Sequence, residues 1–186
     1  VALSVLVVLS PLLVAICLLI KLTSNGPIFF IQPREGLRGV PFRILKFRTM
    51  YADRCDAAGV VQATAGDTRI TPVGRLLRRL NIDELPQLIN VLRGEMSLIG
   101  PRPHPFDMLA AGVRYDEHVP YYHRRLAMKP GLSGWAQCNG LRGPTLDPVT
   151  AKARIDHDLA YIQNFSLLLD LRAAWRTLAR ELRSGM

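Results

Sequence analysis

The first twenty residues constrain this chain most, because Val1 to Ile20 are almost all apolar and carry no charge before Lys21. As a helix they would be ~30 Å long, which matches the hydrocarbon thickness of a bilayer. Pro11 stands near the midpoint, lacks a backbone N–H and clashes with the Val7 carbonyl, while Ser10 can bond a freed carbonyl. We therefore expect a membrane segment, either a single span or a re-entrant hairpin broken at Ser10 and Pro11.

The rest of the chain is basic and lacks the cysteine pattern of a disulfide framework. Lys and Arg number 24 against 15 Asp and Glu, for a net charge of +9. This favours an anionic partner: nucleic acid, anionic lipid or a phosphorylated substrate.

The Arg and Lys after the apolar run place that part of the chain in the cytoplasm. A cleaved signal peptide is the alternative, but its charged start and cleavage site are missing. The chain begins with Val, so we expect residues upstream. Three cysteines that are far apart in the sequence argue against a disulfide framework and a zinc site of paired thiolates: Cys17, Cys55 and Cys138. The four histidines lack metal-ligand spacing, so each is expected to be a surface or satisfied polar residue: His104, His118, His123 and His157.

Two short extended stretches follow the apolar run, Ile28 to Gln32 and Pro41 to Met50, and a Gly-rich charged segment joins them. This pattern predicts a β-hairpin. On an extended second stretch, Lys46 and Arg48 lie on one face, because alternate side chains of a strand share a face. Two neighbouring cations can hold a diphosphate; the alternative is a solvated strand face.

The densest chemistry lies between Thr71 and Pro103. Asn81 to Asp83 interrupt a short helical run before a second run begins, because Pro86 is tolerated only in the first turn of a helix. Asp83 therefore lies at or near a helix N-terminus. One interpretation is an N-cap at Asp83 and a first-turn acid at Glu84. The other is a site where paired carboxylates among arginines gather a metal ion and phosphates. There the cations and the helix dipole would keep Asp83 ionised well below neutral pH, so that it attacks phosphorus without a base.

Five motifs in this order resemble the monotopic phosphoglycosyl transferases, also called bacterial sugar transferases: Ser10-Pro11, KFRTM at 46–50, DELPQ at 83–87, GPRP at 100–103 and KPGLSGWAQ at 129–137. The resemblance covers nearly all of the chain. It implies an α+β, mostly helical fold with a re-entrant membrane helix-hairpin at 1–26 broken at Ser10 and Pro11. A small β-hairpin and interfacial amphipathic helices belong to a cytoplasmic catalytic domain at 27–186.

The resemblance also implies an activity at the cytoplasmic face of the bacterial inner membrane. Such an enzyme transfers a sugar 1-phosphate from a UDP-sugar to polyprenyl (undecaprenyl) phosphate and releases UMP, as the first membrane step of exopolysaccharide synthesis. By motif, Asp83 is the nucleophile that forms an acyl phosphate and Glu84 is a ligand of Mg²⁺. Positive positions around the phosphates correspond to Lys46, Arg48, Arg78 and Arg102.

The last third is similar to the hexose-transferring members, in Asn139 to Gly143 and Tyr161 to Leu171. This implies glucose or galactose as the sugar. Longer members carry further domains upstream, so we expect this chain to be the catalytic portion of a larger protein. Candidates for nucleotide or sugar contacts are Trp135, Gln137 and Arg142, of which Trp135 is equally a packed core aromatic.

The final helix, Ser166 to Arg183, has arginines on one side and an apolar stripe on the opposite side. The stripe consists of Leu168, Leu171, Trp175, Leu178 and Leu182. Such a helix either lies in the bilayer interface or packs on the core with a solvated face. Two rival functions remain. A membrane-tethered nucleic-acid binder would use basic helical runs around Asn81, but Asp83 and Glu84 would repel its phosphates. A lipid-docking scaffold would use the final helix and no catalytic carboxylate. We expect no nucleic-acid partner, and the sequence leaves the oligomeric state open.

Overall fold

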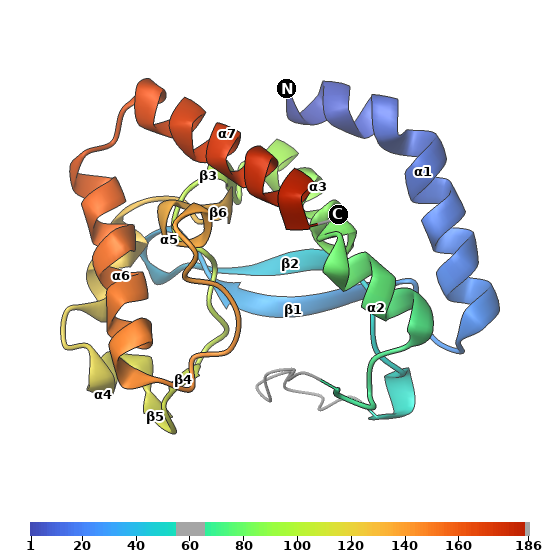
Figure 1. Ribbon diagram of the computed structural model, residues 1–186, viewed down its shortest axis with the longest axis horizontal. Helices are drawn as coiled ribbons and strands as arrows, with labels where there is room; N and C mark the ends of the chain where they lie inside the picture. Colours follow the sequence, from blue (N-terminus) through green and yellow to red (C-terminus); the bar gives the residue numbers. More distant parts are fainter. Residues whose placement is uncertain (55–65, 185–186) are drawn as a thin grey trace.

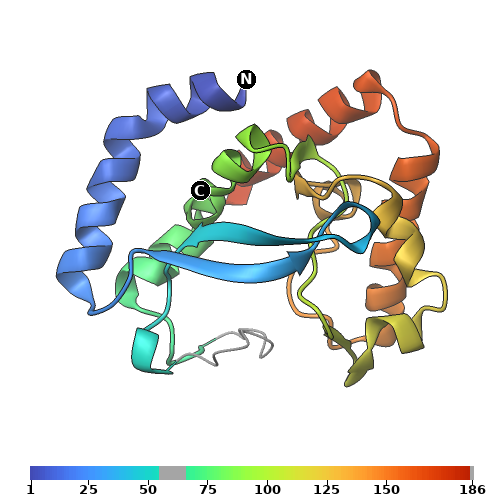
Figure 2. The same ribbon diagram turned by 180° about the vertical axis from the view of Figure 1, so that it is seen from behind.

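A computed structural model describes residues 1–54 and 66–184, with the main chain alone at 181–184. It has a mixed α/β architecture in which helices hold about half of the residues. Figure 1 shows a central β-hairpin, β1–β2, with α1 at one end, α6 at the other and α7 running above it from the α6 end. Figure 2 shows the same arrangement from behind. The mixed architecture agrees with the α+β prediction.

Helix α1, Ala2–Thr23, is one bent helix that runs through Ser10 and Pro11 (Figure 1). Ser10 Oγ donates a hydrogen bond of 2.8 Å to the Val7 carbonyl, which is the acceptor that Pro11 leaves without a donor. This local repair was predicted from the sequence. The predicted re-entrant hairpin is not confirmed, because α1 bends but does not fold back on itself.

Helix α1 buries Ala2 near its start and Ile16 and Ile20 in its second half. Ile16 and Ile20 are buried in a cluster with Phe47 and Leu77. The large apolar side chains of the first half are mostly exposed. Within the described part of the chain, α1 is the one helix long and apolar enough to cross a membrane. The structure thus shows an apolar helix of which only a few side chains are buried.

Strands β1 (Phe29–Glu35) and β2 (Pro41–Phe47) form an antiparallel pair in which Phe30 lies opposite Lys46. The short 3-10 turn η1 (Leu37–Gly39) joins them. The predicted hairpin is confirmed, although β1 is longer and β2 shorter than expected. Arg48 therefore lies beyond the end of β2 rather than on its face.

The acidic motif lies between two short helices, α2 (Pro72–Arg79) and α3 (Gln87–Leu92). Thr71 caps α2, since its Oγ1 accepts from the Gly74 N–H at 2.8 Å. Asn81 then adopts a left-handed conformation with φ of 52°, and the turn η3 (Ile82–Glu84) follows. The predicted interruption at Asn81 is confirmed. Asp83 lies in η3, before α3 begins, and no side-chain cap bond is found there.

A short parallel pair brings two distant motifs together. Strand β3 (Ser97–Ile99) pairs with β6 (Gly131–Ser133), so that GPRP follows one strand and the other lies within KPGLSGWAQ. A Cβ added at Gly131 would lie 2.1 Å from the Gly100 nitrogen. Only glycine allows the two backbones to approach this closely. The fixed spacing holds the GPRP loop in place.

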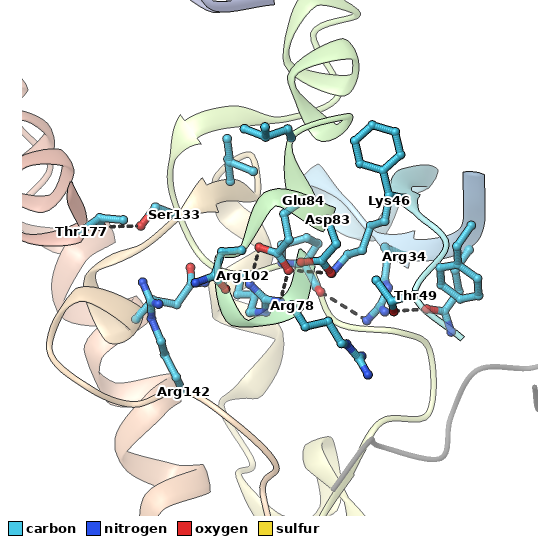
Figure 3. A pocket seen from close by; sticks show the side chains of 18 of the residues that line it. Arg34, Lys46, Thr49, Arg78, Asp83, Glu84, Arg102, Ser133, Arg142 and Thr177 are labelled. Carbon is cyan, nitrogen blue, oxygen red and sulfur yellow. Dashed lines mark hydrogen bonds and ion pairs between the residues drawn. The ribbon is translucent and has the colours of Figure 1, made fainter. Parts of the chain in front are cut away.

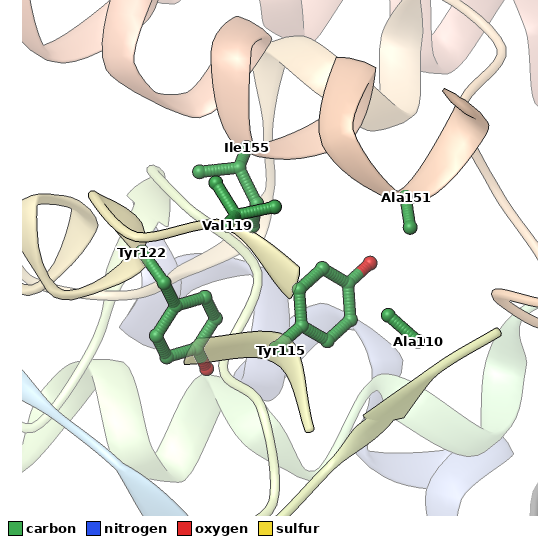
Figure 4. Packing of buried hydrophobic residues seen from close by; sticks show 6 residues of the cluster. All are labelled: Ala110, Tyr115, Val119, Tyr122, Ala151 and Ile155. Carbon is green, nitrogen blue, oxygen red and sulfur yellow. The ribbon is translucent and has the colours of Figure 1, made fainter. Parts of the chain in front are cut away.

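Most of the remaining elements are short: η2 (Ala52–Arg54), β4 (Leu109–Ala110), β5 (Val113–Arg114), α4 (Tyr115–His118), η4 (Tyr122–Ala127) and α5 (Trp135–Cys138). Two long helices end the chain, α6 (Pro148–Gln163) and α7 (Leu167–Ser184). Helix α6 covers a core cluster that includes Tyr115, Tyr122 and Ile155 (Figure 4). Asp147 caps α6, since its Oδ2 accepts from the Thr150 N–H at 2.7 Å.

The bounds of α7 agree with the predicted final helix within one residue at each end. Its apolar stripe does not pack on the core. Its buried contact is Ala173, whereas the stripe is exposed at Leu168, Leu171, Trp175 and Leu178. The predicted stripe residue Leu182 has a side chain outside the described part. The exposed stripe is the arrangement expected of the interfacial alternative.

Candidate active site

A cavity of about 820 Å³ lies between the hairpin, η3, the GPRP loop and α7, and it contains Asp83 and Glu84 (Figure 3). This volume is in the range of small-molecule and cofactor sites. Cationic side chains line much of it: Arg34, Lys46, Arg48, Arg69, Arg78, Arg102, Arg142 and Arg154. Apolar residues of α1 and α7 close another part of the wall, among them Val5 and Leu178. The cavity thus combines a cationic region with an apolar one.

Asp83 is 8 % exposed, and burial together with the adjacent Glu84 raises its pKa to about 6. Lys46, Arg78 and Arg102 oppose this shift but do not cancel it. The prediction that Asp83 is ionised well below neutral pH is therefore wrong: desolvation of the carboxylate outweighs its neighbouring cations. At pH 7 a group with this pKa is still about nine-tenths ionised.

Glu84 is held by two cations from different parts of the chain (Figure 3). Its Oε1 accepts from Lys46 Nζ at 2.7 Å and from Arg102 Nη2 at 2.6 Å. Arg102 Nη1 lies 3.3 Å from Oε2. These cations hold the pKa of Glu84 well below its usual range despite burial. The sequence motifs KFRTM, DELPQ and GPRP therefore meet at one carboxylate.

The carboxylates of Asp83 and Glu84 are compatible with Mg²⁺ only when a substrate adds oxygens. Mg²⁺ in phosphate-transferring enzymes takes one or two carboxylates together with substrate phosphates. Asp83 and Glu84 are the two acidic residues that line the cavity in the described ranges. No group of three or more potential metal ligands occurs within those ranges. Magnesium binding at Glu84 stays a prediction.

Of the other predicted phosphate contacts, Arg78 is directed into the cavity, whereas Arg48 already has partners. Arg78 lines the wall near Asp83 (Figure 3), and its buried Nη1 has no partner among the described residues. Arg48 Nη2 donates to the Ser24 carbonyl at 2.8 Å and to Ser24 Oγ at 2.9 Å, and Nη1 donates to the Asn25 carbonyl. Arg48 therefore ties the end of α1 to β2.

The predicted nucleotide or sugar contacts separate into two groups. Gln137 and Arg142 line the cavity. Trp135 does not; its ring packs near Ile99 and Cys138, and Arg176 Cζ lies 5.0 Å from its centroid. The structure thus agrees with the packed-aromatic interpretation of Trp135.

The family model for bacterial sugar transferases matches residues 1–184. The chain belongs to this family. Exopolysaccharide production protein PSS from Rhizobium leguminosarum bv. phaseoli is 51% identical over 184 residues, which are 99% of this chain and 92% of the relative. UDP-glucose:undecaprenyl-phosphate glucose-1-phosphate transferase from Caulobacter vibrioides is 51% identical over 168 residues, or 90% and 61% of the two chains.

A third relative is the undecaprenyl-phosphate glucose phosphotransferase of Komagataeibacter xylinus, 46% identical over 177 residues. The match covers 95% of this sugar transferase chain and 33% of that relative. The chain therefore spans about a third of one named glucose phosphotransferase and less than two thirds of the other.

Several cavity residues of this bacterial sugar transferase were not singled out as candidates from the sequence, among them Arg34, His104 and Arg154. Arg34 extends from β1, and burial together with Arg102 lowers its pKa to about 10. Arg154 belongs to α6, is 4 % exposed and donates to the Gly143 carbonyl at 3.1 Å. The alternation of side chains along β1 could have indicated on which face of the hairpin Arg34 lies. No local sequence pattern indicates that α6, and with it Arg154, lies near the acidic motif.

Proposed function

We propose that this chain transfers a hexose 1-phosphate, from UDP-glucose or UDP-galactose, to undecaprenyl phosphate and forms undecaprenyl diphosphate hexose and UMP. The observation that carries the proposal is a buried carboxylate, Asp83, inside a cavity with a cationic part and an apolar part. The names of the Caulobacter and Komagataeibacter relatives support the substrates. The Rhizobium relative supports a role in exopolysaccharide synthesis.

In the first step, an Asp83 carboxylate oxygen attacks the phosphorus that carries the hexose. The bond from that phosphorus to the bridging oxygen of the diphosphate breaks, and UMP leaves with the bonding electron pair. The product is an acyl phosphate between Asp83 and the hexose. A mostly ionised Asp83 requires no base for this attack. Arg78 and Arg102 stabilise the negative charge that builds up on the phosphate oxygens.

In the second step, a phosphate oxygen of undecaprenyl phosphate attacks the same phosphorus. The acyl phosphate bond breaks, and Asp83 is released as a carboxylate. The second pKa of a phosphate monoester is near 6, so the acceptor is largely dianionic at neutral pH and also needs no base. Two displacements at one phosphorus replace a single exchange between two bulky anions.

Magnesium would neutralise phosphate charge and polarise the transferring oxygens. Glu84 is the ligand that we assign to it, together with oxygens of the substrate. Within the chain, Lys46 and Arg102 orient Glu84 from opposite sides before any ligand binds. Membrane association is supported by the exposed apolar part of α1. We place the cavity at the cytoplasmic face of the inner membrane, where nucleotide sugars and the lipid phosphate meet.

The test separates the first step from the second. The full chain in lipid nanodiscs is incubated with Mg²⁺ and UDP-hexose labelled in the sugar, without acceptor lipid. We expect labelled protein and stoichiometric UMP, and we expect Asp83→Asn to abolish both. Asp156→Asn is the matched control, because Asp156 pairs with Lys152 on α6 and does not line the cavity. Label on the Asp83→Asn protein would refute the assignment of the nucleophile.

A further inference from the structure

His104 is a buried cavity residue for which the proposed chemistry has no use. It follows the GPRP motif, is 1 % exposed and lines the cavity. Its carbonyl accepts from the Glu35 N–H at 3.0 Å, which ties this loop to β1. The ring stacks near Tyr115 and Tyr122, with centroid distances of 4.9 and 5.8 Å. The imidazole is therefore held in one orientation.

A chain of hydrogen bonds sets the tautomer of His104. The Tyr122 hydroxyl donates to Glu35 Oε2 at 2.5 Å and lies 3.1 Å from His104 Nδ1. Because the single hydroxyl proton of Tyr122 is used toward Glu35, its oxygen accepts from Nδ1–H. Figure 4 shows the Tyr122 ring with its hydroxyl directed away from Ile155 on α6. In this tautomer Nε2 carries a lone pair and no proton.

The surroundings keep the ring neutral. Burial and the charges of four arginines lower the pKa of His104 well below its ordinary value. The four are Arg125, Arg154, Arg34 and Arg102. A neutral ring with Nδ1 protonated presents an acceptor at Nε2. That atom is buried and has no hydrogen-bond partner in the described part of the chain. A buried acceptor without a partner is costly, so a ligand that donates there is favoured.

The type of ligand group follows from this protonation state. Phosphate oxygens are acceptors at neutral pH and gain nothing from Nε2. The donors on a UDP-hexose are the hydroxyls of the two sugars and the uracil N3–H. Arg102 contacts Glu84, next to Asp83, and His104 is two residues further, at most about 7 Å along the chain. In the proposed mechanism the hexose stays bonded at Asp83 while UMP leaves, so we take its hydroxyls as the donors to His104.

We propose that His104 Nε2 accepts a hydrogen bond from one hydroxyl of the transferred hexose, and that His104 is a specificity-determining residue of this site. The inference rests on the proposed function, since it takes UDP-hexose as the ligand. It assigns a contact to the sugar rather than to the phosphates or the lipid.

The test measures binding in a chain that cannot transfer the sugar, Asp83→Asn, in nanodiscs. Competing ligands are UDP, UDP-glucose and its 2-, 3-, 4- and 6-deoxy analogues. With His104 intact, we expect one deoxy analogue to bind about ten-fold more weakly than UDP-glucose, because it leaves the Nε2 acceptor unpaired. The other three analogues should bind nearly as well as UDP-glucose. A series with no sensitive position overturns the proposal without any further variant.

Two isosteric variants then assign the effect to Nε2. In His104→Asn the amide reaches the place of Nδ1 and keeps the link to Tyr122, but the acceptor at Nε2 is lost. In His104→Gln the amide reaches the place of Nε2 and its oxygen still accepts there. We expect His104→Asn to bind UDP-glucose about ten-fold more weakly and no longer to distinguish the sensitive deoxy analogue. His104→Gln should retain both properties in large part.

The outcomes separate the possible explanations. Equal weakening of UDP and UDP-glucose by His104→Asn would place the contact on uridine and overturn the sugar assignment. Equal weakening of UDP-glucose binding by His104→Asn and His104→Gln would mean that the His104 ring contributes packing alone. That result would overturn the proposal as well. UMP release by the chain with Asp83 intact tests the transferase activity separately. Binding with the expected deoxy pattern but without UMP release would refute that activity and leave the His104 contact standing.

Discussion

At the scale of single residues, the most buried ion pair in the described part of the chain lies next to the GPRP motif rather than at Asp83 and Glu84. Arg125 and Asp158 are both 2 % exposed, and Arg125 Nη2 lies 2.7 Å from Asp158 Oδ2. The same guanidinium donates to the Arg102 carbonyl. This pair therefore links α6 to the backbone of the GPRP motif, from which Arg102 reaches Glu84.

Removal of one partner should be costly. In Asp158→Ala the Arg125 charge stays buried without its counter-charge, for which we expect a loss of about 3–5 kcal/mol in the free energy of unfolding. Asp156→Ala on the same helix breaks an exposed pair with Lys152 and a hydrogen bond of 2.6 Å from the Tyr121 hydroxyl, and it should cost about 1–2 kcal/mol. Urea unfolding of both variants in detergent measures the difference. Losses of equal size would show that burial of the Arg125–Asp158 pair has no special role.

His104 should make stability depend on pH. Its pKa is depressed in the folded chain, so below about pH 6.5 the unfolded chain binds a proton that the folded chain does not. Stability is therefore lost as pH falls, by about 1 kcal/mol between pH 6.5 and 5.5 and by about 1.4 kcal/mol for each pH unit further down. We expect the unfolding midpoint to drop by about 2–4 °C more in the parent chain than in His104→Gln between pH 6.5 and 5.5. Parallel midpoint curves would contradict a neutral, buried His104.

Part of the site could be predicted at this scale because some of its residues are close in sequence. Asp83 and Glu84 are adjacent, and Lys46 and Arg102 belong to short motifs that the structure brings to Glu84. The pKa of Asp83 could not be predicted, because it depends on how much water the fold excludes. Arg154 could not be found either, since it comes from a helix about seventy residues beyond the acidic motif.

At the scale of elements, local sequence signals predicted where helices begin and end better than they predicted which elements pair or pack together. Pro86 and Asn81 marked the break between α2 and α3, and the arginine and leucine periods marked α7. The pairing of β3 with β6 was missed, since each strand has only three residues and a parallel pair has no connecting turn. Pro11 predicted a distortion of α1, but the size of a bend depends on how neighbouring groups compensate it, as Ser10 does here.

The bend in α1 leads to a prediction about topology. A straight helix of this length would span the bilayer, whereas a bend partway along shortens its reach across the membrane. We therefore expect a cysteine at Leu3, which is 61 % exposed, to react with a membrane-impermeant maleimide only from the cytoplasmic side. The background chain has alanine at its three cysteines, and Lys152→Cys is the control on the part of the chain that we place in the cytoplasm. Reaction of Leu3→Cys from the periplasm would show that α1 crosses the membrane.

At the scale of the whole molecule, two exposed apolar surfaces lie toward the same side. The first half of α1 and helix α7 both run along the upper edge in Figure 1, and Figure 2 shows them together from behind. The side chains of Val8 on α1 and Trp175 on α7 are 75 % and 72 % exposed. Val5 and Leu178 from the same helices line the cavity. The two helices that expose apolar surface therefore also contribute to the wall of the cavity that holds Asp83.

This arrangement predicts that α7 serves the lipid-dependent step alone. Replacement of Leu171 and Trp175 by glutamate places charge on the exposed stripe, and each lost apolar contact with lipid would cost about 1.5–3 kcal/mol. Because α1 is unchanged, the double variant should still float with liposomes. We expect UMP release without acceptor lipid to stay within about two-fold of the parent, while transfer to undecaprenyl phosphate slows about ten-fold or more.

The control uses an equally exposed apolar pair away from this side. Leu146 and Val149, before and at the start of α6, are 72 % and 75 % exposed, and that end of α6 points away from α7 in Figure 1. Leu146→Glu with Val149→Glu should leave both half-reactions unchanged. Slower lipid transfer in the control pair would mean that added negative charge, not position on α7, repels the lipid phosphate. Slower UMP release in the α7 variant would instead place α7 in the donor half of the cavity, because Thr177 and Leu178 belong to its wall.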